Sequence, residues 1–456
     1  MKNNTLEFYP FRIFSQNGKN YIFSGEMSGI FEIDKKTQAI IAQEGKPLSE
    51  AYDNVSQLMT ESEFENLIEK MNNFRFIRTQ ETDETIHRLR SSTMQIGVNS
   101  LILFVIQGCN LRCSYCFATD GEYHDKGIMS LGTAKKAVTF LAKHSTSDTP
   151  SLSFFGGEPL LNFKLLKKLV PHIHKVEKKY NKQFSMGITT NGTLLDKEVK
   201  DFLIQNNIRC MISMDGNQQT QDANRRFAND SGSYDLVVEK TRDMRENNQL
   251  SCRATVTPIS LDVSASFEHL TELNFTGVFF DAAKNVMSEK EYEEYGRQLV
   301  HLFEELKEMA DAGEYELVKK SSNLMNFLRL IHRAGLRKSS CGAGQSVIAV
   351  DIHGDIYPCQ RYVSEKDYCI GNVYTGWTNK DVRNNFLDAV NIENHTQCSN
   401  CWAKNLCMGD CAYENLMQTG SISQTSEAIC KHKKEIFEAA IQLYLSLPED
   451  FKESLN

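Results

Sequence analysis

Residues 101–116 read LILFVIQGCNLRCSYC, an apolar strand that runs directly into three cysteines spaced over eight residues. The cysteines therefore lie on the loop at a strand end, which is where α/β barrels place their chemistry. Three thiolates this close together can each bind one iron of a four-iron cubane, and the fourth iron is then left open. An open metal position indicates catalysis because a substrate can coordinate there. A zinc site that takes its fourth ligand from elsewhere in the chain is the alternative interpretation.

Strands and helices alternate after this stretch, over residues 98–320. Apolar strands are expected at residues 101–106, 152–155, 184–189, 209–214, 253–257 and 278–281. Helices are expected between and after them, at residues 133–144, 163–180, 197–206, 234–247, 263–273 and 289–312. Each crossover helix returns the chain to the same edge, so these units predict a parallel sheet. Six units are too few for a closed eight-stranded barrel, so the predicted fold class is α/β, a partial (β/α)6 TIM barrel.

Further regions flank the predicted barrel. Residues 1–80 show three short alternating strands, helical patterns around residues 37–43 and 61–72, and an extended segment at residues 74–79. They predict a small winged-helix-like domain, and residues 81–97 form a linker. Residues 321–340 predict a bridging helix. Residues 341–435 are rich in cysteine and poor in regular pattern, which is typical of a domain organised by metals. Residues 436–456 are expected to form a C-terminal helix or tail.

The composition is that of a globular protein, with 41% hydrophobic and 24% charged residues. A net charge of −8 argues against a broad nucleic-acid surface, and the lysines between Lys164 and Lys179 suit the solvated face of a helix. No stretch approaches the ~20 apolar residues that cross a bilayer, and no secretory signal is recognisable. We therefore expect a cytoplasmic protein without a membrane partner. Thirteen cysteines in such a protein, clustered as they are here, indicate metal ligation.

The cysteine triplet resembles the motif of the radical S-adenosylmethionine (SAM) superfamily. The resemblance implies that Cys109, Cys113 and Cys116 bind a 4Fe-4S cluster, with Tyr115 as the aromatic residue expected before the last cysteine. It further implies that the open iron binds the amino and carboxylate groups of SAM. One electron then cleaves SAM to a 5′-deoxyadenosyl radical.

The ends of the next three strands resemble segments that contact SAM in this superfamily. Gly156-Gly157-Glu158-Pro159 is similar to the segment that contacts the SAM amino group. Two glycines let a ligand approach the backbone closely, and a glutamate can accept a hydrogen bond from an ammonium group. Ser213 is expected at the ribose, and Arg225 at the carboxylate or ribose, although a surface arginine is an equal alternative. The residues expected to contact SAM are Tyr115, Gly156, Gly157, Glu158, Thr190, Asn191, Ser213 and Arg225.

Seven further cysteines form a second constellation in the C-terminal region, and four of them follow the pattern C-x2-C-x5-C-x3-C. This constellation resembles the SPASM domain of peptide-modifying radical SAM enzymes, which holds two auxiliary 4Fe-4S clusters. The resemblance therefore implies three 4Fe-4S clusters in all. The family pairing assigns Cys341, Cys359 and Cys411 to the first auxiliary cluster, and Cys398, Cys401, Cys407 and Cys430 to the second.

Two fully ligated clusters need eight thiolates, and this constellation supplies seven. Some relatives, the anaerobic sulfatase-maturing enzymes among them, carry an extra cysteine shortly before the position of Cys341, whereas residues 333–340 here contain none. The first auxiliary cluster is therefore expected to keep an open iron that attracts a substrate thiolate, or else to take Cys369 as its ligand. Sulfatase-maturing enzymes also carry an aspartate, their proposed base, directly after the cysteine that matches Cys359. This chain has Gln360 there, which accepts no proton at neutral pH.

The N-terminal strands resemble the RiPP recognition element, a peptide-binding domain found on many maturases of ribosomally made peptides. The likeness lies in residues 21–23 and 29–34. An exposed strand edge of this kind can accept a leader peptide as an added strand. A purely structural cap on the barrel is the alternative.

Together these resemblances imply a radical SAM peptide maturase that forms thioether crosslinks in a precursor peptide, similar to ranthipeptide, sactipeptide and freyrasin enzymes. Its cofactors would be SAM and three 4Fe-4S clusters, and its partners the precursor peptide and an electron donor of the flavodoxin or ferredoxin type. Carbon–carbon crosslinking, epimerisation and sulfatase-type maturation are alternative outcomes of the same chemistry. A zinc- or cluster-binding protein without catalysis is the alternative of another class.

Overall fold

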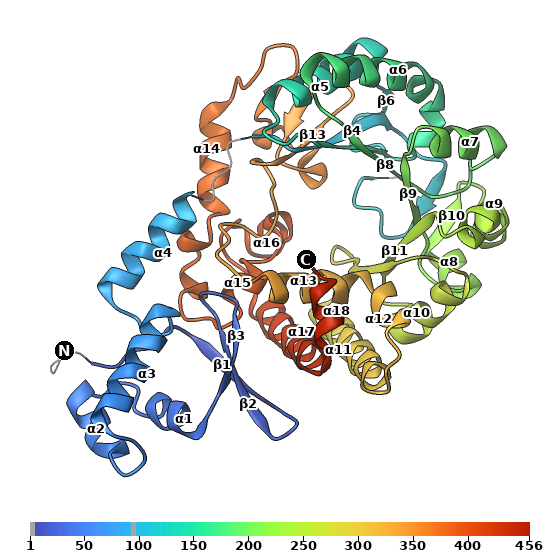
Figure 1. The fold of residues 1–456 in the computed structure, drawn as a ribbon. Helices are drawn as coiled ribbons and strands as arrows, with labels where there is room; N and C mark the ends of the chain where they lie inside the picture. The colour runs from blue at the N-terminus through green and yellow to red at the C-terminus, as the bar shows by residue number, and fades with distance from the viewer. Residues whose placement is uncertain (1–4, 93–96, 120) are drawn as a thin grey trace.

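The computed structural model describes residues 5–92, 97–119 and 121–456 (Figure 1). Its largest sheet has ten strands, in the order β12-β11-β9-β8-β7-β4-β13-β14-β15 with β6 paired to β4. Seven of these strands are mutually parallel, and six of them are the strands expected from the sequence, which confirms the predicted parallel sheet. Their bounds are β4 (Ser100–Gln107), β7 (Ser151–Gly156), β8 (Ser185–Thr190), β9 (Arg209–Ser213), β11 (Leu250–Val256) and β12 (Val278–Ala282).

The crossover helices lie on the outer side of the curved sheet (Figure 1). They are α5 (Leu131–His144), α6 (Phe163–Tyr180), α7 (Lys197–Gln205), α9 (Tyr234–Glu246), α10 (Val263–Glu272) and α11 (Glu289–Asp311). Local chemistry explains several starts: Ser130 and Asp196 accept hydrogen bonds from the first-turn amides of α5 and α7. Ser288 and Glu291 form a capping box at α11. The result is the predicted partial barrel, open on one side.

Burial alternates along the parallel strands, as expected for a sheet with two different environments. Along β7, β8, β9, β11 and β12, every second residue is buried among the helices, and the residues between them are less buried. The latter set includes Phe155, Thr189, Ser213 and Thr255, which line a cavity inside the curve. The strand register therefore decides which side chains reach that cavity.

The C-terminal region continues the barrel sheet, which the sequence did not predict. Strand β13 (Val347–Val350) pairs in parallel with β4, and β14 (Asp355–Tyr357) and β15 (Gly371–Asn372) follow antiparallel. The expected bridging helix is α13 (Ser322–Arg333). The region also contains α14 (Lys380–Ala389), α15 (Lys404–Cys407), α16 (Ala412–Thr419), α17 (Glu427–Ser446) and α18 (Glu449–Glu453). Helix α17 packs against α11 and α13, so the expected boundary at residue 435 falls inside a helix that belongs to the main core.

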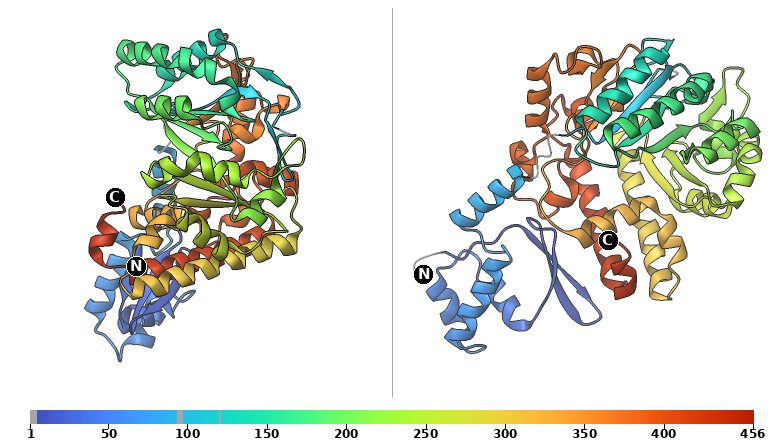
Figure 2. Two further views of the ribbon diagram at one scale, coloured as in Figure 1. Left: turned by 90° about the vertical axis from the view of Figure 1, so that its right-hand side faces the viewer. Right: turned by 45° about the horizontal axis from the view of Figure 1, so that its top comes forward.

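The N-terminal unit has a small core of its own, formed by Leu6, Ile22, Ile40, Val55, Phe64 and their neighbours. It consists of an antiparallel sheet of β1 (Phe11–Gln16), β2 (Lys19–Ser24) and β3 (Ile30–Ile33), followed by α1 (Lys35–Ile41), α2 (Leu48–Val55) and α3 (Glu61–Asn73). Helix α2 was not predicted, and residues 74–79, expected to be extended, make only an isolated bridge, between Phe8 and Ile77. Most of the predicted linker is helix α4 (Gln80–Ser92), which connects this unit to the barrel (Figure 2).

A polar contact fixes this unit against the cysteine-rich region. Arg90 of α4 is 1% exposed and pairs with Glu26 at 2.7 Å, and its guanidinium also donates to the Asn405 side chain at 2.8 Å. The Asn405 amide donates in turn to the backbone carbonyls of Gly25 and Glu26. Trp402 packs edge-on against Phe14 and Phe23 beside it.

The remaining elements are short. They are β5 (Leu111–Cys113), β6 (Gly127–Ile128), α8 (Gln218–Asn224), β10 (Arg225–Phe227) and α12 (Glu316–Lys320). Among the helices of the described ranges, none is both long and apolar enough to span a bilayer.

Candidate active site

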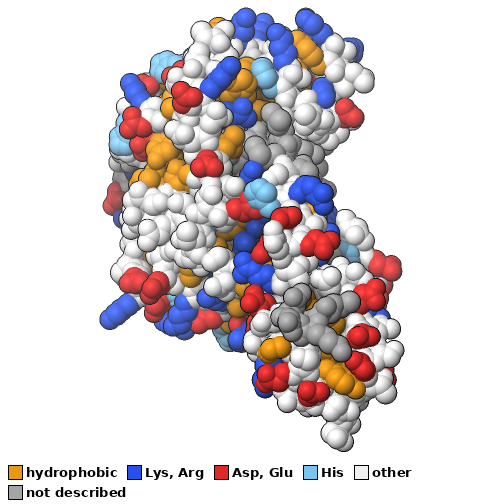
Figure 3. Space-filling model, turned by 90° about the vertical axis from the view of Figure 1, so that its left-hand side faces the viewer, with side chains coloured by type: hydrophobic (Ala, Val, Ile, Leu, Met, Phe, Trp, Pro, Cys, Tyr) orange, Lys and Arg blue, Asp and Glu red, His pale blue; other side chains and the backbone are white. Residues whose placement is uncertain are grey.

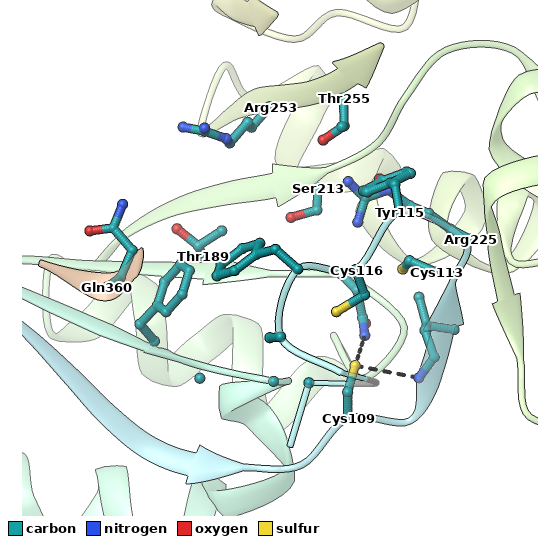
Figure 4. A pocket seen from close by; sticks show the side chains of 18 of the residues that line it. Cys109, Cys113, Tyr115, Cys116, Thr189, Ser213, Arg225, Arg253, Thr255 and Gln360 are labelled. Carbon is teal, nitrogen blue, oxygen red and sulfur yellow. Dashed lines mark hydrogen bonds between the residues drawn. The ribbon is translucent and has the colours of Figure 1, made fainter. Parts of the chain in front are cut away.

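Cys109, Cys113 and Cys116 line one end of the cavity inside the barrel, which has a volume of about 220 Å³ (Figure 4). The loop that carries them is fixed by an antiparallel pairing of β5 with β10, which sets Cys113 opposite Arg225. The Cys109 Sγ atom accepts hydrogen bonds from the Leu111 backbone N–H at 3.4 Å and the Asn191 side-chain amide at 3.9 Å. N–H donors of this kind are typical around cluster-bound sulfur.

The chemistry of these cysteines fits an iron–sulfur cluster. Burial raises the pKa of the Cys109 thiol to about 12 and that of the Cys113 thiol to about 11. The Arg225 guanidinium only partly offsets this effect at Cys113, so without a bound metal both thiols would stay protonated, whereas bound iron would keep them as thiolates. Three soft sulfur donors on one short loop match the requirements of such a cluster.

Gly156 and Gly157 line the cavity next to the cysteine loop. A Cβ atom on Gly157 would collide with the carbonyl oxygens of Gly108 and Gly121, and one on Gly156 would collide with that of Ile106. Gly156 also has a φ of +141°. The two glycines are therefore required for close packing of this segment on the loop that carries Cys109.

Glu158 is completely buried and is not among the cavity-lining residues of the described chain. Its Oε1 accepts from the Leu160 N–H at 3.0 Å and the Thr190 hydroxyl at 2.7 Å, and its Oε2 accepts from the Asn191 N–H at 2.7 Å. The carboxylate thus connects the loops after β7 and β8. Burial raises the pKa of the Glu158 carboxyl to about 7. Its expected contact with the SAM amino group stays a prediction.

Arg225 and Tyr115 meet at a third residue, Asp215, which the sequence analysis did not assign. Its carboxylate accepts from the Tyr115 hydroxyl at 2.7 Å, the Arg225 Nη2 at 3.0 Å and the Thr255 N–H at 2.9 Å. The Arg225 guanidinium lies 5.3 Å from the Tyr115 ring centroid, and its buried Nε has no hydrogen-bond partner within the described residues. Arg225 therefore lines the cavity and is not a surface arginine, with a donor available for a ligand. The sequence could have indicated this carboxylate, because Asp215 follows Ser213 by two residues at the same strand end.

The opposite wall of the cavity is charged and comes partly from the C-terminal region. Gln360 lies across the cavity from the three cysteines (Figure 4), and Arg361 follows it. Arg253 of β11 pairs with Asp281 of β12, and Arg361 lies 3.4 Å from Glu414 and 4.0 Å from Asp281. Alternation along the predicted strands could have found Arg253 and Asp281. Arg361 reaches this wall only through the tertiary fold.

Cys341, Cys359 and Cys411 come together beside this wall. The Cys359 thiol interacts electrostatically with both of the others, and Gln360 next to it lines the cavity. Cys369 packs against the same hydrophobic cluster as Cys359, and its thiol donates to the Gly371 carbonyl at 3.4 Å. The alternative that Cys369 supplies the fourth ligand of this group stays a prediction.

Cys398, Cys401, Cys407 and Cys430 line a second cavity, of about 620 Å³, at the start of α17. A buried charge cluster lies next to them. Although burial raises it, the pKa of the Asp410 carboxyl lies well below its usual value because the Lys284 and Lys433 ammonium groups are 3.1 and 3.0 Å away. Both predicted cysteine groups are thus assembled from distant segments. In the part of the chain that the structure describes, no three His, Cys, Asp or Glu side chains converge as ligands of one metal ion.

Family comparisons agree with this arrangement. Residues 103–260 match the model of the radical SAM superfamily, and residues 341–402 match SPASM, an iron–sulfur cluster-binding domain. The chain therefore contains a radical SAM region, followed by a SPASM iron–sulfur cluster-binding domain.

The individual proteins that resemble most of this chain are distant from it in sequence. The chain is similar to the cysteine-type anaerobic sulfatase-maturating enzyme of Clostridium novyi, at 24% identity over 76% of this chain and 96% of the relative. It is 23% identical to the serine-type enzyme of Bacteroides thetaiotaomicron, over 72% of this chain and 86% of that one. The solved structure of native anSMEcpe with bound AdoMet is 22% identical, with a TM-score of 0.66 over 78% of this chain and 100% of the other. This last likeness shows a shared fold.

Proposed function

We propose that this enzyme is a peptide maturase that installs thioether crosslinks in a ribosomally synthesised precursor peptide. With SAM and iron bound, the centre at Cys109, Cys113 and Cys116 would supply the 5′-deoxyadenosyl radical that removes a hydrogen atom from the acceptor residue. One observation carries the proposal. Gln360 lines the same cavity as the three cysteines and directly follows Cys359, a member of the first auxiliary group, which supports a role for that group beside the cavity.

That first group suits a substrate thiol. Cys341, Cys359 and Cys411 would bind one 4Fe-4S cluster and leave one iron for an outside ligand, unless Cys369, which packs against the same hydrophobic cluster as Cys359, takes that position. Iron–sulfur centres prefer soft sulfur ligands, so a cysteine of the peptide would bind there as a thiolate. Cys398, Cys401, Cys407 and Cys430 would bind a third cluster.

The cavity residues would position the cofactor and protect the reaction. Arg225 offers its free Nε to an anionic group of SAM, and Ser213 offers a hydroxyl at the end of β9. Phe117, Tyr123 and Phe155 supply aromatic walls that exclude water from a radical. Gln360 can orient a substrate by hydrogen bonding but cannot take a proton from it.

The N-terminal unit would bind the leader of the precursor peptide. Strand β3 lies at the edge of its sheet and pairs with β2 alone among the described strands. Beside this edge, Phe31 contacts Phe74 and Phe76, and Phe74 is 53% exposed. An added strand along β3 would gain backbone hydrogen bonds and an aromatic pocket. A flavodoxin or ferredoxin would supply the electron.

The test is mass spectrometry of the cognate precursor after anaerobic co-expression. Each thioether removes two hydrogens and blocks one cysteine to alkylation. Cys341→Ala should abolish the crosslink while SAM cleavage continues, because the radical centre is intact. Cys369→Ala, the matched control, should still form it. An unchanged precursor mass with wild-type enzyme would contradict the proposal.

Sulfatase-type maturation is the second candidate, since sulfatase-maturating enzymes of both the cysteine and serine types are similar to most of this chain. Gln360 on the cavity wall, in place of a carboxylate, weighs against it. The product separates the outcomes. A new aldehyde, trapped by a carbonyl reagent, would favour sulfatase-type chemistry. A loss of two hydrogens with alkylatable thiols and no trappable carbonyl would indicate a carbon–carbon bond. Epimerisation would leave the mass unchanged.

A further inference from the structure

The outer face of helix α6 is densely basic. Its exposed side chains include Lys164, Lys167, Lys168, Lys175, Lys178 and Lys179. The neighbouring helix α5 adds exposed Lys136 and Lys143. We call these eight lysines the α5–α6 basic face.

The helical repeat explains why the lysines gather. At 3.6 residues per turn, the six lysines of α6 fall within a sector of about 120°, along a helix of roughly 27 Å. Leu166, Leu169 and Ile173 occupy the opposite, buried side. Of the eight lysines, only Lys167 forms an ion pair with an acid among the described residues, with Glu198 at 2.6 Å.

This face contrasts with the rest of the molecule. The chain has a net charge of −8, so without these eight lysines the remainder has a net charge of −16. Helix α5 contains no acidic residue, and the one acid of α6, Glu177, contacts His174 and the Phe184 N–H. Figure 3 shows Lys and Arg side chains gathered, with few acids, at the top of the view, where α5 and α6 lie. An ordinary solvated face mixes both signs.

The position of the face is also informative. Helix α6 begins shortly after Gly156 and Gly157, which pack directly on the loop of Cys109. The lysines of its first turns, Lys164 and Lys168, therefore lie at the end of the barrel that carries the three-cysteine centre.

The side-chain type indicates the kind of partner. The basic face contains lysine and no arginine, whereas fixed recognition of phosphate groups favours the bidentate arginine fork. Lysine ammonium groups are well-hydrated point charges that accelerate encounter more than they tighten binding. Small, weak and transient interfaces of this type are those of electron-transfer pairs. The strongly acidic remainder of the chain disfavours a nucleic acid.

We propose that the α5–α6 basic face is the docking surface for an acidic electron-transfer protein of the flavodoxin or ferredoxin type. The reduced donor would lose one electron, and the cluster at Cys109, Cys113 and Cys116 would gain it. This inference rests on the proposed radical SAM chemistry, in which one electron cleaves SAM.

The test compares two triple variants of equal charge change in the cluster-loaded enzyme. Lys164→Glu/Lys168→Glu/Lys175→Glu reverses the face, and Lys70→Glu/Lys290→Glu/Lys380→Glu reverses three exposed lysines on other helices. Stopped-flow absorbance follows the oxidation of a photoreduced acidic flavodoxin by each enzyme. The face variant should lose about tenfold or more in second-order rate constant and most of its salt dependence, whereas the control should stay within about twofold.

Light-driven reduction by a neutral deazaflavin radical tests the radical SAM chemistry separately from the docking of the electron donor. SAM cleavage with this reductant should be equal in all three proteins, and its absence from wild type would instead refute the radical chemistry. Equal flavodoxin rates for the two triple variants would overturn the docking proposal. A larger loss in the flavodoxin rate constant with Lys431→Glu/Lys434→Glu, beside the second cysteine cavity, would also overturn it. Selective loss of nucleic-acid binding by the face variant would overturn it as well.

Discussion

Asp215 shows how a single residue organises the end of the cavity that carries the three cysteines. Its side chain is fully buried and accepts hydrogen bonds from a phenol, a guanidinium and a backbone amide. The sequence analysis named Tyr115 and Arg225 from their resemblance to the family, but the carboxylate between them depends on strand ends meeting in space. Residues that contact a ligand can be found by motif, and residues that orient them require the fold.

Replacing Asp215 should lower the free energy of unfolding more than removing any single hydrogen bond to its carboxylate. Asp215→Asn leaves the Arg225 guanidinium buried without its counter-ion, a loss of about 3–5 kcal/mol in stability. Tyr115→Phe, the matched control, removes one hydrogen bond to the carboxylate and should cost about 1.5–3 kcal/mol. Anaerobic thermal unfolding at equal iron content measures the difference, and calorimetry should show weaker SAM binding by Asp215→Asn. Equal costs would show that the Arg225 pairing is dispensable.

Glu158 should leave a signature in the pH dependence of stability. Its pKa is about 7 in the folded protein against an ordinary 4.5, so between these values the folded chain keeps a proton that the unfolded chain has released. Its contribution to the free energy of unfolding therefore falls as pH rises from about 4.5 to about 7, by about 3 kcal/mol. Glu158→Gln cannot titrate, so urea unfolding should show its stability improving relative to wild type across that range. A difference that does not vary with pH would contradict this assignment.

At the scale of elements, local pattern predicted the barrel well and the additions to it poorly. The six predicted parallel strands and their crossover helices follow from apolar periodicity, to within a few residues at each end. Strand β13 has only four residues and pairs with β4, which lies about 250 residues earlier in the chain. No local pattern encodes such a pairing. Helix α2 was missed because its apolar positions are few and its N-cap is Pro47, which makes no side-chain hydrogen bond.

The contact between α4 and the cysteine-rich region should depend on the Arg90–Glu26 pair. Arg90→Met leaves Glu26 buried with only Lys404, 3.4 Å away, and should cost about 3–5 kcal/mol. Hydrogen exchange should then rise in residues 24–29 and 402–407. Removing both charges, in Arg90→Met/Glu26→Gln, should restore much of the protection. Unchanged exchange in the single variant would show that apolar packing around Trp402 is sufficient.

At the scale of the whole molecule, the cysteine groups were predictable and the walls between them were not. The resemblance to the SPASM domain grouped Cys398, Cys401, Cys407 and Cys430, which line one cavity. Arg361 lies on the cavity wall opposite the three cysteines because the C-terminal region continues the barrel sheet. The sequence carries no short-range signal for this position.

Truncation should reveal that shared sheet. A chain ending at Gly335 would expose the edge of β4 and the face of α11 that packs on α17, so we expect it to aggregate. A chain starting at Thr79 loses the N-terminal unit, most of whose core is its own although Phe14 and Phe23 pack in the main core, and should stay monodisperse. Size-exclusion chromatography distinguishes the two. A well-behaved monomer from the C-terminal truncation would show that the barrel folds independently.

The hydrogen-bonded continuity from β4 to β13 has a consequence for the flow of electrons. Tunnelling rates depend steeply on distance. Cys109 follows β4 and Cys359 follows β14 of the same sheet, so the fold sets the separation of these two cysteines. In the proposed reaction the precursor peptide, held by its leader at the N-terminal unit, would still have to bring its reacting residues to the cavity. If the proposed function holds, peptide binding, movement and release would limit turnover, because the distances between the cysteine groups are fixed by the fold.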